Sequence, residues 1–197
     1  MPQVQLSHLE DIFPKLAIAG YEKTSDQTGG QLDDGSYNCI AWAAEDVNHK
    51  FWWPNRFGYW LPWVRRENSV RCFVKTFRWL GYFRCKSSRR ELGFDKVALY
   101  AIHCSQQPIP PPTSLNELRD WTPTHMARQL SDGTWTSKCG CDEDINHFLL
   151  DALKCHGPTT AKYGSPVIYM KRLVPISWII RKIQRIAWAI ESSRENP

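Results

Sequence analysis

The sequence predicts an α+β domain in which N-terminal helices pack on a central antiparallel sheet, followed by a C-terminal amphipathic helix. Apolar residues recur at helical spacing early in the chain, β-prone runs separated by turn residues follow, and isoleucines recur at helical spacing near the end. We therefore expect an irregular lead-in over 1–35, a globular domain over 36–173 and a basic amphipathic helix over 174–197. A chain of 197 residues, 42% of them hydrophobic, is long enough to bury a sizeable core.

The first half of the domain contains two expected helices. One begins at Asn38, a favourable N-cap residue, and places apolar side chains along one face. The other extends over 69–80, where apolar residues are spaced three and four apart, and Gly81 can end it. The segment 51–63 is rich in tryptophan and proline, so we expect a loop that packs aromatic rings.

The second half of the domain contains the expected strands. They are 96–102, 124–130, 134–138 and 166–173. Asp132-Gly133 between two of them is a strong signal for a hairpin turn.

Three other segments complete the expected layout. The proline-rich excursion over 106–123 has few apolar residues and could flank a site. For 145–153 we expect a short helix, with a capped loop as the alternative. From Ile176 to Ile190 the isoleucines share a face opposite basic residues, which is typical of an amphipathic helix.

Composition limits the classes of partner and compartment. A formal charge of +5 permits an acidic partner but does not establish nucleic-acid binding, which usually shows Lys and Arg clustered among the aromatics. We identify no signal peptide and no membrane-spanning run, so we expect a cytoplasmic protein, with export by a non-classical route left open. The seven cysteines form no CxxC pair and predict free thiols, with no metal and no cofactor. Zinc held by Cys139, Cys141 and His147 is an alternative that lacks a fourth ligand.

A candidate catalytic pair stands out because of its residue types and their placement. Cys39 is at the start of the first expected helix, where the helix dipole stabilises a thiolate, and His125 lies on a strand, where a rigid imidazole could act as its base. Asn38, beside the cysteine, could cap the helix or donate to an oxyanion.

The identity of a third catalytic residue depends on the register of the 124–138 hairpin. A tight two-residue turn would put Thr136 and Lys138 on the His125 side, whereas a longer loop would put Ser137 there. We favour Ser137 and keep Thr136 and His147 as alternatives.

Several segments together resemble papain-fold cysteine hydrolases of the NlpC and CHAP type. They are Asn38-Cys39-Ile40-Ala41-Trp42-Ala43, Lys96-Val97-Ala98-Leu99-Tyr100, Thr124-His125-Met126-Ala127-Arg128-Gln129 and Gly133-Thr134-Trp135-Thr136-Ser137-Lys138. The chain is also similar to uncharacterised bacterial proteins that share these segments, Ile145-Asn146-His147 and Tyr163-Gly164. The resemblance implies a papain-like fold with a cysteine that opens a helix, a histidine on the sheet and a third polar residue that orients the histidine.

Two functions follow from these observations. The first is a cysteine-dependent hydrolase or acyl transferase that acts on an amide bond of a peptide or protein (as a peptidase, amidase or deamidase), with Cys39 as nucleophile, His125 as base and Ser137 as orienting residue. The second is a non-catalytic module on the same fold that binds a protein partner through its aromatic loops or its C-terminal helix.

Overall fold

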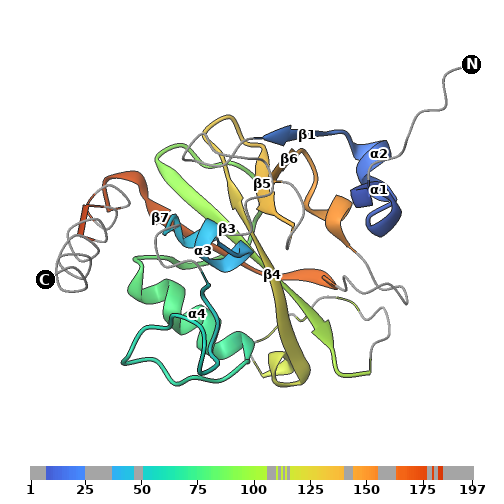
Figure 1. Cartoon of the computed structure of the whole chain (residues 1–197). Coiled ribbons are helices and arrows are strands. Elements are labelled where there is room, and N and C mark those ends of the chain that lie inside the picture. The colour runs from blue at the N-terminus through green and yellow to red at the C-terminus, as the bar shows by residue number, and fades with distance from the viewer. Residues whose placement is uncertain are drawn as a thin grey trace, which may run out of the picture.

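The computed structural model describes residues 8–24, 37–46, 51–105, 110, 112, 114, 116–139, 144–154, 163–176, 179, 182 and 183. Its framework is a seven-stranded antiparallel sheet with the strand order β1-β6-β5-β4-β3-β7-β2. The strands are β1 (Tyr21–Thr24), β2 (Phe83–Cys85), β3 (Phe94–His103), β4 (Trp121–Gln129), β5 (Trp135–Lys138), β6 (Asp144–His147) and β7 (Ser165–Leu173). The long strands β4, β3 and β7 are neighbours in this order, with β4 in the middle of the sheet (Figure 1).

The helices cover both faces of this sheet. The α-helices are α1 (His8–Ile12), α2 (Lys15–Ala19), α3 (Cys39–Ala44) and α4 (Val70–Trp79), and two 3₁₀ turns are η1 (Glu117–Asp120) and η2 (Leu150–Leu153). In Figure 1, α3 lies against the sheet and α4 below it, whereas α1 and α2 lie near the β6 end. In the part of the chain that is described, no helix is long and apolar enough to cross a membrane.

Strand alternation separates the buried side chains into two clusters. The α3-side core contains α3, α4 and the aromatic loop, together with Val97, Leu99 and Met126 of the sheet. The α1-side core contains residues of α1, α2 and η2, together with Tyr100 and Ala127. Because neighbouring residues of a strand point to opposite faces, Met126 and Ala127 of β4 belong to different cores.

Most of the predicted elements of the domain are confirmed. Asn38 caps α3, and Ser69 caps α4 by accepting a hydrogen bond from the Cys72 amide. The predicted strands at 96–102, 124–130, 134–138 and 166–173 correspond to β3, β4, β5 and β7, which are neighbours in the antiparallel sheet. The chain is therefore α+β, as its sequence predicts.

Three predictions about the elements were wrong. The lead-in over 1–35 is not irregular where it is described, since 8–24 forms α1, α2 and edge strand β1. The segment 145–153 is mostly strand β6 and turn η2 rather than an α-helix. The short strand β2 was not expected, and β4 begins at Trp121, inside the predicted proline-rich excursion. The C-terminal segment is helical at 174–176, 179, 182 and 183, and its remainder lies outside the described residues.

Candidate functional site

Cys39 is a buried thiol in the α3-side core. The backbone amides of Met126, Cys39 and Ile40 donate toward its sulfur, which lowers its pKa. The loss of solvent around the thiol has the larger effect, and the pKa is raised to about 11. The thiol is therefore protonated at neutral pH, and the helix start does not produce a thiolate.

His125 belongs to β4, and its side chain points to the face of the sheet opposite Cys39. Its ring stacks on Tyr163 with a centroid distance of 4.1 Å and an interplanar angle of 6°. It also meets the edge of Tyr100, a residue of the α1-side core, at a centroid distance of 5.3 Å. Burial, and secondarily the nearby His147, lowers the pKa of His125 well below its usual value.

The structure does not bring the predicted Cys39–His125 pair together. The Cys39 side chain packs in the core that contains Met126, whereas His125 points to the core that contains Ala127. The sheet itself therefore separates the thiol from the imidazole. A base must reach the proton that it removes, directly or through one water, and this arrangement does not allow it.

Asn38 makes structural contacts with its whole amide group. Its Oδ1 accepts hydrogen bonds from the Ala41 amide at 3.0 Å and from the Trp52 amide at 3.3 Å. Its Nδ2 donates to the Trp52 carbonyl at 2.8 Å. Asn38 thus caps α3 and fixes the aromatic loop to the helix start, which is a different role from the predicted oxyanion donor.

Ser137 joins His125 to His147 in a buried polar chain. His125 Nε2 lies 3.1 Å from Ser137 Oγ, and Ser137 Oγ lies 3.0 Å from His147 Nε2. The chain ends at the Leu149 carbonyl, 3.0 Å from His147 Nδ1. The contact of Ser137 with His125 is the one that the longer-loop register predicts, since Thr136 pairs with Arg128 and the strands are joined through 130–134.

The protons of this chain have one consistent arrangement. A carbonyl only accepts, so His147 Nδ1 donates to Leu149 and His147 Nε2, in the neutral ring, accepts from the Ser137 hydroxyl. Ser137 then accepts from His125 Nε2, and the buried Nδ1 of His125 has no partner in the described structure. Burial lowers the pKa of His147 to about 4, so the ring is neutral at neutral pH. Because Ser137 and the rings of His125 and His147 are fully buried, we assign this series of hydrogen bonds a structural role.

Thr136, an alternative candidate for the third catalytic residue, faces away from His125. Thr136 Oγ1 accepts from the Trp42 indole at 3.3 Å on the α3 side of the sheet. The guanidinium of Arg128 lies 4.6 Å above the centre of the Trp42 ring. Thr136 therefore anchors α3 to the sheet.

Further residues of the Thr124–Gln129 segment also have structural partners. Thr124 Oγ1 donates to the Tyr163 carbonyl at 2.6 Å, which positions the ring that stacks on His125. Gln129 Nε2 donates to the carbonyls of Ser88 and Gly133 at 3.1 Å each, which closes the hairpin against a loop. This part of the segment holds the sheet to its surroundings.

Glu45 is a central residue that sequence analysis missed. It ends α3 with a left-handed φ of 58° and pairs with Arg128 at 2.9 Å and with Arg172. Arg172 is completely buried and stacks over the Tyr82 ring. The only sequence signal was the acidic end of the expected helix, which does not reveal partners 83 and 127 residues away.

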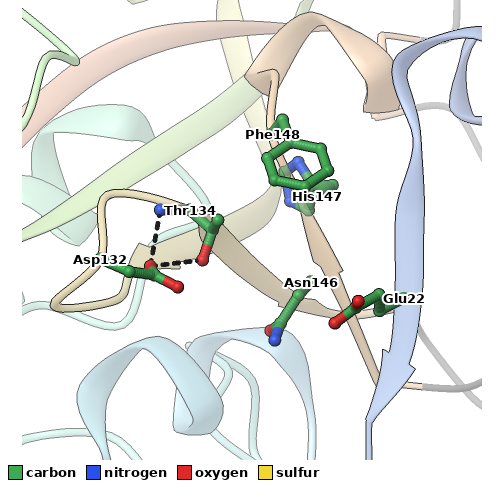
Figure 2. Close-up of a pocket in the computed structure, with 6 residues that line it drawn as sticks. All are labelled: Glu22, Asp132, Thr134, Asn146, His147 and Phe148. Atoms are coloured by element: carbon green, nitrogen blue, oxygen red, sulfur yellow. Dashed lines mark hydrogen bonds between the residues drawn. The ribbon is translucent and has the colours of Figure 1, made fainter.

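A small hollow of about 210 Å³ lies beside His147 (Figure 2). Its lining residues are Glu22, Asp132, Thr134, Asn146, His147 and Phe148. Thr134 donates to Asp132 through both its amide and its hydroxyl, which lowers the pKa of that carboxyl. Both ring nitrogens of His147 are already hydrogen-bonded, so the ring offers this hollow no free nitrogen.

The predicted alternative of a zinc site has no support in the described residues. They contain no group of three His, Cys, Asp or Glu side chains that could hold a metal. Cys139 is buried, and Cys141 lies outside the described residues.

A second groove, of about 410 Å³, lies between α4 and the end of the aromatic loop. Its residues are Trp63, Val64, Arg65, Lys75, Arg78 and Trp79. Trp63 and Trp79 pack edge to face with centroids 5.5 Å apart, yet 61% and 64% of their surfaces remain exposed. We expected the aromatic rings of 51–63 to pack inside the domain, and Trp63 is an exception; Trp79 lies at the end of α4, outside that segment.

Comparison with known proteins gives a family match for this chain. Residues 27–171 match a family described as "Domain of unknown function (DUF7689)", and this match covers most of the chain. No curated protein and no solved structure matches the chain.

Proposed function

Because the chain belongs to the DUF7689 family, whose description specifies no activity, we propose from its geometry that it is a non-catalytic protein-interaction module on a papain-like scaffold. The observation that carries the proposal is the exposed pair of Trp63 and Trp79. Tryptophan and arginine are the residues that most often dominate binding energy at protein interfaces. A contiguous aromatic surface is also costly to leave in water, which favours its use as a contact.

The placement of the candidate catalytic residues supports a binding role over a hydrolytic one. A hydrolase that used Cys39 and His125 would need both side chains on one face of the sheet and within reach of a substrate. Cys39 is instead a buried, protonated thiol, and His125 faces the opposite core. The papain-like arrangement, a cysteine-bearing helix on an antiparallel sheet, serves in this proposal as a rigid support for the aromatic surface.

The groove is held in shape before any partner arrives. The Trp60 indole donates to the Arg65 carbonyl at 3.2 Å, and the Val64 amide donates to the Leu61 carbonyl at 3.0 Å. Trp60 also packs edge to face on Phe73 of α4. A preformed surface loses little conformational entropy on binding, which favours affinity.

Selection of peptides from a random displayed library on the full chain tests this proposal. We expect the selected peptides to bind the wild type and Cys39→Ala equally. They should not bind the double variant Trp63→Ala with Trp79→Ala. The melting temperature of each variant establishes that it is folded. Selected peptides that bind the double variant as well as the wild type, or that are cleaved in a Cys39-dependent manner, would contradict the proposal.

A further inference from the structure

The exposed face of α4 carries only positive charge beside the tryptophan pair. Arg71, Lys75, Arg78 and Trp79 are its exposed residues up to the end of the helix, at spacings of three and four that place them on one side. The helix contains no acidic residue. Within the part of the chain that is described, no carboxylate forms an ion pair with Arg71, Lys75 or Arg78.

Positively charged and apolar side chains line the same groove. Lys75 and Arg78 line it together with both tryptophans and the buried Val64. An occupant that complements this surface has carboxylates for the helix face and an apolar side chain for the space against the rings. Unpaired charges at a binding surface gain most from an oppositely charged partner, which also accelerates encounter.

We infer that this groove binds an acidic segment of a partner protein, with an apolar anchor residue packed against Trp63 and Trp79 and Asp or Glu side chains paired with Lys75 and Arg78. This inference rests on the proposed interaction function and specifies the chemistry of the partner.

One feature favours an acidic polypeptide over a nucleic acid. The edge-to-face packing of Trp63 against Trp79 occupies one ring face, whereas single-stranded nucleic acids bind through successive bases stacked on open faces. A groove of about 410 Å³ has room for a few inserted side chains.

An array of paired peptides tests the inference on the full-length chain. Each acidic peptide contains Leu or Phe flanked by Asp and Glu, and its twin replaces every Asp by Asn and every Glu by Gln. We expect the acidic peptides to bind at least about tenfold more tightly than their twins, a preference that declines as salt is added. Lys75→Glu with Arg78→Glu should remove this preference.

Matched controls separate the groove from overall charge. The double variant Lys15→Glu with Arg84→Glu makes the same change in net charge at exposed positions outside the groove, on α2 and β2. It should bind the acidic peptides like the wild type. Trp63→Ala should weaken acidic peptides and twins alike, because both use the apolar anchor.

The outcomes distinguish this inference from the proposed function. Equal binding of acidic peptides and twins, with loss of both in Trp63→Ala, would overturn the acidic specificity and leave the interaction function intact. Peptide binding that is indifferent to Trp63→Ala would overturn both. A single-stranded oligonucleotide that displaces the acidic peptides at lower concentration than any peptide would replace the inference with a nucleic-acid ligand.

Discussion

The side chains of Cys39 and His125 lie on opposite faces of the sheet, although His125 belongs to β4 and Cys39 lies beside the same part of that strand. The amide of Met126, the residue that follows His125, is near enough to the Cys39 sulfur to lower the pKa of that thiol. The His125 ring points the other way, toward Tyr100 and Tyr163. The thiol therefore lies beside the backbone of the residue that follows His125, and the sheet separates it from the imidazole.

The first prediction concerns the reactivity of the thiols. Burial raises the pKa of Cys39 to about 11, whereas Cys104 is exposed. Because the thiolate is the reactive species, iodoacetamide at neutral pH should alkylate Cys104 well before Cys39, as measured by peptide mass spectrometry. His125→Ala should leave the Cys39 rate unchanged relative to Cys104 in a folded variant. Preferential labelling of Cys39 that depends on His125 would restore the catalytic pair.

The second prediction concerns acid stability. The pKa of His147 is lowered from 6.5 to about 4 in the folded chain, so the unfolded chain takes up the proton first as the pH falls. The free energy of unfolding should therefore decrease between about pH 6.5 and pH 4, by roughly 3 kcal/mol from this group, and His125 should add to the decrease.

Urea unfolding at a series of pH values measures this effect. His147→Gln removes the titrating group, so its stability should change less over the same interval even if it is lower overall. An identical pH slope in the variant and the wild type would show that His147 does not titrate as its burial requires.

The third prediction concerns Glu45. Glu45→Gln would leave Arg172 and Arg128 without their shared carboxylate in a buried setting, which should cost about 3 kcal/mol of unfolding free energy. Glu67→Gln breaks the exposed pair with Arg65 and should cost less than about 1 kcal/mol. Chemical denaturation of the two variants compares them directly, and similar losses would argue against a central role for Glu45.

The fourth prediction compares two glycines with positive φ. Gly164 has a φ of +70°, and a Cβ there would lie 2.1 Å from the Ala101 carbonyl oxygen. Gly93 has a φ of +80°, and no atom of the described chain lies within 4 Å of its Cβ position. Gly164→Ala should therefore destabilise the fold by about 2–4 kcal/mol and Gly93→Ala by only about 1 kcal/mol. Equal melting temperatures would show that the chain beside Tyr163 can move away.

The helices and strands of the domain were largely predictable because their signals are local. Asn38 caps α3, and the apolar spacing in 69–80 defines α4 without reference to the rest of the chain. Strand β6 was missed because it has four residues and only one of them, Ile145, is apolar. Asp144 is polar yet buried, and it pairs with Lys138 of the neighbouring strand at 3.6 Å and accepts a hydrogen bond from the distant Tyr37 hydroxyl.

Only the part of the candidate site that lies on one face of the sheet could be predicted from the sequence. Alternation placed His125 and, in the longer-loop register, Ser137 on a common face, and their hydrogen bond confirms that placement. It could not tell which face α3 covers, because either face presents small or apolar residues to a helix. Met126 faces α3, and this placement separated Cys39 from His125.

The affinity of one acidic, apolar-anchored peptide for three full-length proteins tests the central claim most directly. Fluorescence anisotropy would compare the wild type, Cys39→Ala and Trp79→Ala, each shown by its melting temperature to be folded. The account predicts that Cys39→Ala binds like the wild type and that Trp79→Ala binds at least about tenfold more weakly. The account would be contradicted if Trp79→Ala bound the peptide like the wild type while Cys39→Ala lost either the binding of the peptide or its turnover.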